Sequence, residues 1–514
     1  MNSISYNKTL QISLFATGCA GIVAEFVLSS LATYLLGNAI FQWTIVMSFM
    51  LFAMGIGSRI SRNIKKKLFD SFIITEFALS VFCSSSGIIA FAGFTQFNGV
   101  IIYCFSMCIG ILIGMEIPLA TRINSEFQDL RFNISSIMEM DYFGSLIGGL
   151  VFAFFFLPFL GLTYTPIILG TINFIVASYL FFKFKKFIIA KKIIFILFVC
   201  VLSFLIILTF LVKPIIRFGE QKKYKDKIVL SRQTKFQKIV ITKWKKWYWL
   251  YINGDEQFST YDEERYHEPL VHPAMKLASD CSKILILGGG DGLAAREVLK
   301  HPKVKAITLV DIDSIMTDLA KKNPILTRIN QGSMNNPKVS IFNYDASKFL
   351  LSDSSLYNVI IIDLPDPDSI DLMHLYSKSF YEDIRKRLTK GGIIVTQATS
   401  PFFAKKAFLC IWKTIKKAGF TTLPYHNQIP TLGEWGWIIG AKKNDINTKN
   451  LKKIAQTINF NDITTKFINN NAMISMIYFG KGVFDSRDAK DIKTNKILDP
   501  ILLQYYHKGS WGIY

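Results

Sequence analysis

The sequence has little cysteine and contains no Cys-x-x-Cys motif. The seven cysteines lie mostly inside apolar stretches and form no Cys-x-x-Cys pair, which argues against a disulfide framework and a zinc site. No arm rich in lysine and arginine carries interleaved aromatic residues, so nucleic acid is not an expected partner. No small-residue cleavage site follows the first apolar run, which is also too long for a signal-peptide core. We therefore expect that run to be a retained membrane segment.

Hydrophobic residues are abundant and unevenly distributed. They make up 51% of the 514 residues, and the mean hydropathy of +0.32 is high for a soluble protein. Residues 10–212 are mostly long apolar stretches, whereas the remainder has the composition of a soluble domain. The formal net charge of +22 partly follows from a lysine-rich composition throughout the chain. Length and this contrast together predict more than one domain.

Several stretches in the first part of the chain have about the 20 residues that cross a bilayer as a helix. Basic residues cluster at 59–67, at 183–192, and at Arg122 and Arg131, and the positive-inside rule assigns such loops to the cytoplasm. Seven spans would then place the second half of the chain outside, whereas the basic segment 213–227 favours the inside. We expect a cytoplasmic second half. This requires either a miscount of one span, which we expect at 141–182, or a first span that enters with Met1 outside despite the loop charges. The seven candidate spans lie at about 10–36, 39–57, 70–94, 99–122, 141–162, 164–182 and 193–212.

Carboxylates also occur within or at the ends of these spans. An ionisable residue inside a bilayer is costly, and by default it indicates function. For Glu25, the deepest by sequence, a functional and a structural role stay equally open. For the others we expect pairing with Arg122 or with neighbouring hydroxyl groups, or a place at the interface. These others are Glu76, Glu116, Glu139 and Asp141.

The most informative stretch is 283–313, KILILGGGDGLAAREVLKHPKVKAITLVDID. An apolar run enters a glycine-dense turn, a helix-like run follows, and a second apolar run ends in Asp311. This is the order of a βαβ unit, in which the glycines let the backbone approach a ligand and the later acid bonds a ribose. Asp291, at the centre of the turn, does not suit a pyrophosphate. The pattern predicts an adenosine-type ligand that carries positive charge.

Strand-like and helix-like runs alternate through the rest of the second half. We expect strands that end at Asp345 and Asp363 and a strand at 393–397, with helices near 375–388 and 404–418. This order predicts a mostly parallel, doubly wound α/β sheet, whose ligands bind beyond the carboxyl ends of the strands.

A small β module is expected ahead of this sheet. Residues 228–256 are rich in β-branched and aromatic side chains, and Asn253-Gly254 is a strong turn signal, which predicts a β-hairpin. The next segment, QFSTYDEERYHEPLVHP at 257–273, is acidic, as are the strand ends. A chain of positive net charge thus gathers its acids locally, so the site should attract cations.

Five motifs follow one another along this half: FQKI, NGDEQFSTYDEERYHEPLVHP, LGGGDG, VDID and DLPDP. Together they resemble the spermidine synthase (polyamine aminopropyltransferase) family from about Lys235 to Lys442. The whole chain resembles the branch with an N-terminal multi-span membrane domain. The resemblance implies a Rossmann-like, methyltransferase-type fold. It also implies transfer of the aminopropyl group of decarboxylated S-adenosylmethionine to a diamine, with putrescine as the expected acceptor and spermidine and methylthioadenosine as products.

The resemblance assigns the donor site residue by residue. Gln237 resembles the glutamine that contacts the methylthioadenosine part, and Asp311 resembles the acid that holds the ribose hydroxyls. His267 and Asp291 resemble the residues around the aminopropyl amine. S-adenosylmethionine itself carries a carboxylate that Asp291 would repel, which favours the decarboxylated donor.

The resemblance also assigns the acceptor site. Asp363 resembles the proton acceptor, Tyr266 the tyrosine that orients the attacking amine, and Asp366 a ligand of the diamine. A protonated amine cannot attack until it loses a proton, and a carboxylate can both bind the cation and accept that proton. Since the sulfonium is already a good leaving group, we expect no metal and no cofactor beyond the donor, which is a co-substrate.

Three departures from the family pattern concern the identity of the acceptor more than the reaction. Asp345 and Ala346 stand where the family has Asp-Gly beside the adenine. Leu364 replaces a hydroxyl beside the base, and Leu432 stands where many relatives place a tyrosine. With Glu25 in a span, they motivate the alternative of a membrane polyamine transporter or sensor whose synthase-like domain binds without catalysis.

The expected fold is an α-helical membrane domain followed by an α/β Rossmann-like domain with an N-terminal β-hairpin module. Expected partners are decarboxylated S-adenosylmethionine, putrescine or a related polyamine, and the lipid bilayer of the cell membrane; a homodimer stays open. The expected division is a membrane domain over 1–212, a basic linker over 213–227, the hairpin module over 228–256, the transferase domain over 257–445 and a helical extension over 446–514.

Overall fold

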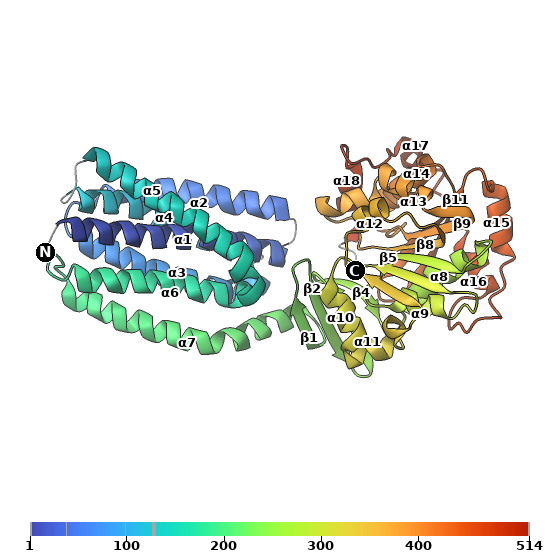
Figure 1. The fold of residues 1–514 in the computed structure, drawn as a ribbon, viewed down its shortest axis with the longest axis horizontal. Helices are drawn as coiled ribbons and strands as arrows, with labels where there is room; N and C mark the ends of the chain where they lie inside the picture. The colour runs from blue at the N-terminus through green and yellow to red at the C-terminus, as the bar shows by residue number, and fades with distance from the viewer. Residues whose placement is uncertain (1–2, 37–38, 98, 126–129, 512–514) are drawn as a thin grey trace. The chain divides into compact units, whose positions relative to one another are not determined.

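The computed structural model describes residues 3–36, 39–97, 99–125 and 130–511 (Figure 1). The chain divides into two compact units, Met1–Lys227 and Ile228–Tyr514. The first is helical, and the second combines two β-sheets with short helices.

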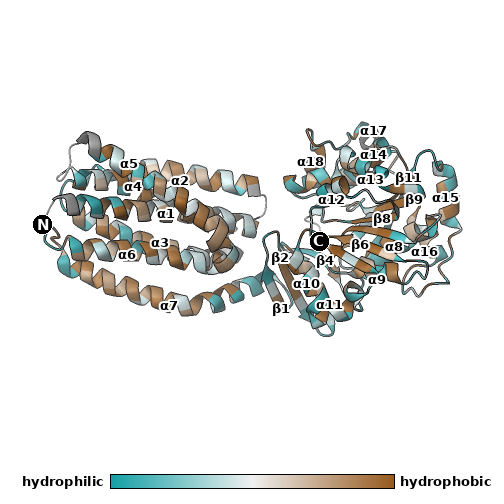
Figure 2. Cartoon of the chain, viewed as in Figure 1, coloured by the Kyte–Doolittle hydropathy of each residue, from teal (hydrophilic) through white to brown (hydrophobic). Residues whose placement is uncertain are grey.

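Long helices of mostly apolar residues build the first unit. Large hydrophobic side chains point outward as well as inward: Phe154, Phe159 and Phe210 are 66%, 79% and 77% exposed, and Figure 2 shows the helices largely in the hydrophobic colour. An apolar surface of this extent is not stable against water, so it needs a cover such as lipid. The helices are α1 (Ser3–Leu36), α2 (Ala39–Ser61), α3 (Leu68–Phe97), α4 (Val100–Asn124), α5 (Leu130–Val151), α6 (Gly161–Lys183) and α7 (Lys191–Lys223), with a π-helical segment η1 (Phe152–Leu160) between α5 and α6.

Within the described ranges, six helical stretches are long and apolar enough to cross a membrane, one fewer than the sequence predicted. The difference arises because the expected spans at 141–162 and 164–182 fall in one continuous stretch, Asn133–Lys183. Its 51 residues would extend about 77 Å as a straight helix, more than twice the ~30 Å hydrocarbon core. Figure 1 shows that the stretch instead reverses direction around η1, which contains Pro158.

Close packing at glycines fixes the direction of the two helices on either side of η1. Backbone atoms of Phe15 and Cys19 in α1 would meet a Cβ added at Gly144 and Gly148 of α5, in the same order along both helices, so α5 runs parallel to α1. Small residues allow this approach of two helix backbones. α6 lies against α1 and α3 and returns across the bundle.

The basic segment 213–227 is not the separate linker that the sequence suggested. Its residues up to Lys223 continue α7, because lysine, arginine and glutamine favour helices and because Val212, Ile216 and Gly219 form a buried face. Towards this end of α7 the ribbon changes from the hydrophobic to the hydrophilic colour in Figure 2. The bundle therefore carries basic residues at the end of α7 as well as in the loops at 62–67 and 184–190.

A four-stranded antiparallel sheet replaces the simple hairpin expected at 228–256. The predicted turn at Asn253-Gly254 is confirmed, since these residues have φ of 54° and 103°, as a type I′ turn requires. Gly254 leads into a further strand, which extends the module to Ser259. The strands are β1 (Lys227–Gln233), β2 (Lys238–Trp244), β3 (Trp247–Ile252) and β4 (Asp255–Ser259), in that spatial order.

The main sheet has seven strands in the order β10-β11-β9-β8-β5-β6-β7. The strands from β9 to β7 are parallel, and β10 and β11 add an antiparallel edge. This mixed α/β sheet confirms the predicted fold class. The strands are β5 (Lys283–Gly288), β6 (Ala306–Val310), β7 (Val339–Phe342), β8 (Tyr357–Asp363), β9 (Leu388–Gln397), β10 (Phe420–Ile429) and β11 (Gly433–Lys442).

Helices cover both faces of this sheet. Ile284 and Ile286 of β5 pack into one hydrophobic core, and the alternating Leu285 and Leu287 pack into the other, which explains why this strand is a continuous apolar run. The helices are α8 (Glu264–Leu277), α9 (Leu293–Leu299), α10 (Ser314–Lys322), α11 (Pro324–Ile329), α12 (Ala346–Ser352), α13 (Lys378–Lys386), α14 (Lys405–Lys417), α15 (Thr448–Gln456), α16 (Asn470–Met476), α17 (Arg487–Asp491) and α18 (Ile501–His507), with short 3₁₀ segments η2 (Ser333–Asn335) and η3 (Ile370–Tyr376).

One buried carboxylate fastens the C-terminal extension to the sheet domain. Glu268 of α8 is 1% exposed and accepts hydrogen bonds from the backbone N–H groups of Lys466, Phe467 and Ile468 at 2.7, 2.8 and 2.8 Å. Three N–H donors satisfy the charge, so its burial is stabilising and not costly.

We predict that Glu268→Gln destabilises the fold by about 2–3 kcal/mol, because an amide directs its own donors at N–H groups that then lack a partner. Thermal unfolding of the full-length chain in detergent measures the loss, and limited proteolysis should show new cleavage near residues 460–470. Asp462→Asn is the matched control: Asp462 pairs with Lys276 but is 65% exposed, and such pairs contribute under about 1 kcal/mol. Equal behaviour of the two variants would contradict the prediction.

Candidate active site

Acidic side chains from four parallel strands meet at one edge of the main sheet. The carboxyl ends of parallel strands lie together, and this edge is where such folds bind ligands. The acids predicted from the sequence follow β5, β6, β7 and β8 in turn: Asp291, Asp311, Asp345, and the pair Asp363 and Asp366.

The glycine turn after β5 lies directly against two of these acids. Gly288 has φ of 84°, and a Cβ there would overlap the carbonyl of Asp363. The Gly290 N–H donates to Asp311 Oδ2 at 3.1 Å, and a Cβ at Gly290 would lie 2.5 Å from that oxygen. Gly288 can only be glycine, and a side chain at Gly290 would displace the carboxylate of Asp311, so the turn lies against the acids after both β6 and β8.

Asp363 is held in place by a tyrosine. Tyr266, in the first turn of α8, donates its hydroxyl to Asp363 Oδ1 at 2.9 Å. The tyrosine ring packs against the rings of His267, Trp435 and Trp437, which fixes its orientation. Burial raises the pKa of Asp363 to about 6, and the nearby His267 limits the rise. The carboxyl group thus titrates close to neutral pH.

Asp366 keeps one oxygen available for a ligand. Its Oδ2 accepts hydrogen bonds from Tyr506 at 2.9 Å and from Thr399 at 3.1 Å. Its buried Oδ1 has no hydrogen-bond partner within the part of the chain that the structure describes. Burial raises the pKa of Asp366 to about 7, with Tyr506, Gln397 and Thr399 acting in the opposite direction.

A buried chain of charges holds His267. Its Nδ1 lies 2.9 Å from Glu263 Oε2, which also accepts from Arg296 at 2.9 Å, and Arg296 donates to Glu297 at 2.8 Å. Burial lowers the pKa of His267, but the hydrogen bond and charge of Glu263 outweigh this effect and raise it to about 8. Burial alone would raise the pKa of Glu263, but the hydrogen bonds and positive charges of His267 and Arg296 bring it down to about 2. Glu263 thus favours the protonated form of His267, which lies beside Asp291.

The other predicted donor residues lie around the end of β6. Gln237, just before β2, donates to Asp313 Oδ2 at 2.9 Å, and the Asp313 N–H donates to Asp311 Oδ1 at 2.8 Å. Burial raises the pKa of Asp311 to about 6, against the hydrogen bond from Asp313. These contacts join the small sheet to the main one.

Asp345 and Ala346 stand at the start of α12, one strand further along the edge. Asp345 caps that helix by accepting from the Lys348 N–H at 2.9 Å, and its other oxygen lies 3.6 Å from His374. Ala346 is 7% exposed. Asp291 uses Oδ1 to accept from the Leu293 N–H at 2.8 Å. The structure therefore places all the predicted residues on one edge, and their individual roles stay predictions.

Sequence reasoning gave no role to several residues that position this site. Tyr506 lies in the expected helical extension over 446–514, and nothing in its surroundings in the sequence signals a contact with Asp366. Glu263 and Arg296 lie inside the quoted motifs, at 257–273 and 283–313, where a buried charge pair was not anticipated. Thr399 follows β9 without any motif.

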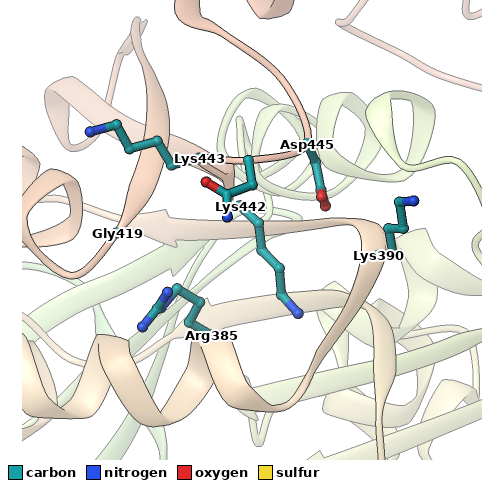
Figure 3. Close-up of a pocket in the computed structure, with 7 residues that line it drawn as sticks. Arg385, Lys390, Gly419, Lys442, Lys443 and Asp445 are labelled. Atoms are coloured by element: carbon teal, nitrogen blue, oxygen red, sulfur yellow. The ribbon is translucent and has the colours of Figure 1, made fainter.

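A hollow of about 370 Å³ lies away from this edge. Figure 3 shows its lining, where Arg385, Lys390 and Lys443 extend around the opening. Lys442 donates to the Leu388 carbonyl at 2.6 Å. The excess of positive charge around the hollow would repel an amine, so the hollow does not compete for the ligand expected at the acidic edge.

Comparison with known proteins identifies the family. A spermine/spermidine synthase domain matches residues 263–453. Polyamine aminopropyltransferase 2 of Aquifex aeolicus is 41% identical over 98% of this chain and 99% of its own length. Polyamine aminopropyltransferases of Leptospira interrogans and Oceanobacillus iheyensis are 37% and 35% identical, over 84% and 100% of this chain and 88% and 99% of their own lengths.

Among solved structures, a spermidine synthase in complex with the transition state analogue AdoDATO is 26% identical, with a TM-score of 0.47 over 51% of this chain and 88% of that one. The curated relatives align along nearly the whole chain, helical unit included. The chain therefore belongs to the polyamine aminopropyltransferase family.

Proposed function

We propose that this aminopropyltransferase moves the aminopropyl group of decarboxylated S-adenosylmethionine to putrescine, with Asp363 as the base. The observation that carries the proposal is the pairing of Asp363, oriented by Tyr266, with Asp366, whose Oδ1 is available three residues further along the same loop. Two carboxylates at successive points of one loop suit the two ammonium groups of a short diamine.

The reaction needs little beyond orientation and one proton transfer. The acceptor nitrogen forms a bond to the propyl carbon next to sulfur, and the carbon–sulfur bond breaks with its electron pair left on sulfur as neutral methylthioadenosine. Asp363 accepts the proton that the attacking amine loses. The donor brings its own leaving group, so we propose that no further cofactor takes part and that positioning supplies most of the acceleration.

The donor is held along the edge from β5 to β7. We propose that Asp311 binds the ribose hydroxyls, that Gln237 contacts the methylthioadenosine part, and that Asp345 and Ala346 lie beside the adenine. Asp291 binds the aminopropyl amine with His267 next to it. A donor that retained its carboxylate would meet Asp291 there, so the decarboxylated form is favoured.

The alternative of a synthase-like domain that binds without catalysis is not favoured. The relatives that align over most of the chain bear the name of the transferase, and this chain retains the carboxylates that the chemistry requires. We further propose that the apolar helices anchor the enzyme in the cell membrane.

The first prediction concerns the base. Asp363→Asn should lower turnover by about 10²–10⁴-fold, the usual cost of losing a general base, while donor binding stays nearly intact. Because burial raises the pKa of Asp363 to about 6, and only the ionised form accepts a proton, kcat/KM of the unaltered enzyme should fall as the pH decreases through about 6. Methylthioadenosine release from decarboxylated donor and putrescine measures the turnover of the variant and the pH dependence of kcat/KM.

Asp318→Asn is the matched control for this measurement, because Asp318 is 59% exposed on α10 and pairs with the exposed side chain of Lys322. Full turnover of the Asp363→Asn variant would show that another group is the base. Absence of product from the unaltered enzyme with putrescine and with longer amines would overturn the proposed reaction.

The second prediction concerns the acceptor. Tyr506→Phe removes a hydrogen bond that favours the ionised form of Asp366, so KM for the diamine should rise by about 3- to 10-fold, the value of one such bond, with a smaller change in kcat. Tyr505→Phe is the control, since the Tyr505 hydroxyl instead accepts from the Lys493 N–H. Equal KM values for both variants would show that Tyr506 does not contribute to binding of the diamine.

The third prediction concerns orientation. Basic residues lie at both ends of the helical bundle, so loop charge alone does not decide it. We propose a cytoplasmic catalytic unit, because both substrates are cytosolic metabolites. A fluorescent protein that matures only in the cytoplasm, fused after the last residue of the chain, should fluoresce, and a periplasmic phosphatase fused there should be inactive. An active phosphatase would reverse the topology.

A further inference from the structure

The helical unit contains two buried carboxylates that aminopropyl transfer does not use. Glu76 of α3 and Glu116 of α4 are 0% and 2% exposed. Their carboxyl groups lie close to one another. Two carboxylates in a low-dielectric interior are costly unless a cation or a hydrogen-bond donor accompanies them.

Their oxygens belong to a larger set of buried acceptors. Within the described ranges, both oxygens of Glu76 and Oε1 of Glu116 have no hydrogen-bond partner, and the same holds for Ser80 Oγ and Asn173 Oδ1. Ser80 lies one turn beyond Glu76 on the same face of α3. Asn173 of α6 donates to the sulfur of Cys83, at 3.9 Å. Three helices therefore present polar atoms to one buried stretch of the bundle.

The cation expected to neutralise these carboxylates is engaged elsewhere. Arg122, one of the partners suggested by the sequence, donates to the carbonyls of Pro118, Ile64 and Ser61 at 3.2, 2.9 and 2.7 Å. Thr17 lies beside Glu116 but donates to the Leu14 carbonyl at 3.2 Å.

The ligand that suits this set is a cation with several donors and no acceptor. A single proton joins only one pair of oxygens, whereas a primary ammonium has three N–H donors and one positive charge. We propose that Glu76 and Glu116 form a binding site for a primary ammonium group, such as the end of a polyamine. The site rests on the geometry of the helical unit, and only the choice of probe follows from the proposed function.

The test is equilibrium binding of labelled putrescine to the full-length chain in nanodiscs of zwitterionic lipid. Asp363→Asn with Asp366→Asn serves as the background, so that the catalytic acceptor site is weakened and turnover does not consume the probe. This background should retain one saturable site. Adding Glu76→Gln and Glu116→Gln should weaken that site by about 10- to 100-fold, as expected when charge-assisted hydrogen bonds are lost.

Glu139→Gln is the matched control, because Glu139 is an exposed carboxylate of α5 in the same bundle, and it should leave the site unchanged. Methylammonium should displace the probe, whereas tetramethylammonium, which has no N–H, should not at the same ionic strength. Undiminished binding after Glu76→Gln and Glu116→Gln would overturn the proposal. Equal displacement by tetramethylammonium or by sodium would overturn it too, because the site would then recognise charge alone.

A second measurement covers the case in which the glutamine variants do not fold. Putrescine should raise the thermal unfolding midpoint of the background variant, and methylammonium should do so more weakly; an unchanged midpoint would reject the site. If the unaltered chain shows no transferase activity and the background variant still binds putrescine at this site, only the proposed reaction is rejected. Transferase activity without this binding would reject only the ammonium site.

Discussion

The active edge of this enzyme depends on a turn that has no side chains where it passes between two acids. Gly288 lies against the carbonyl of Asp363, and Gly290 lies against the carboxylate of Asp311. A Cβ at Gly288 would push β5 away from β8, and a Cβ at Gly290 would displace the side chain of Asp311. Because the turn is bare, acids from neighbouring strands come within reach of one ligand. The same closeness raises their pKa values, since carboxylates that share a buried edge lose water and repel one another.

The main sheet was predictable because its signals are local. The alternation of apolar runs, glycines and terminal acids from Lys283 to Asp363 shows where the strands follow one another along the chain. Once these strands are parallel, their carboxyl ends lie together without further information. The antiparallel edge of β10 and β11 was missed, since its residues look like a loop around Pro430 and Gly433. The helical continuation of 213–223 was missed because charge suggested a linker, whereas burial of one face decided the conformation.

The site was predictable only as far as the motifs extend. Asp363, Tyr266 and Asp366 lie in quoted motifs, but Tyr506 reaches Asp366 across 140 positions of sequence, and no local pattern encodes such a contact. The buried charges of Glu263 and Arg296 were missed for the same reason. In the sequence, each residue looks like a solvated surface charge. Folding buries both, and the charge of Glu263 then raises the pKa of His267.

Tyr506 also gives the synthesis of the chain a definite order of completion. The apolar helices leave the ribosome first, then the sheets, and the hydroxyl that restrains Asp366 leaves last among the residues of the site. A nascent chain can therefore complete its helical unit and order its donor edge while the acceptor pocket still lacks one wall. The enzyme should therefore bind the diamine at full strength only after Tyr506 has been synthesised and has reached Asp366.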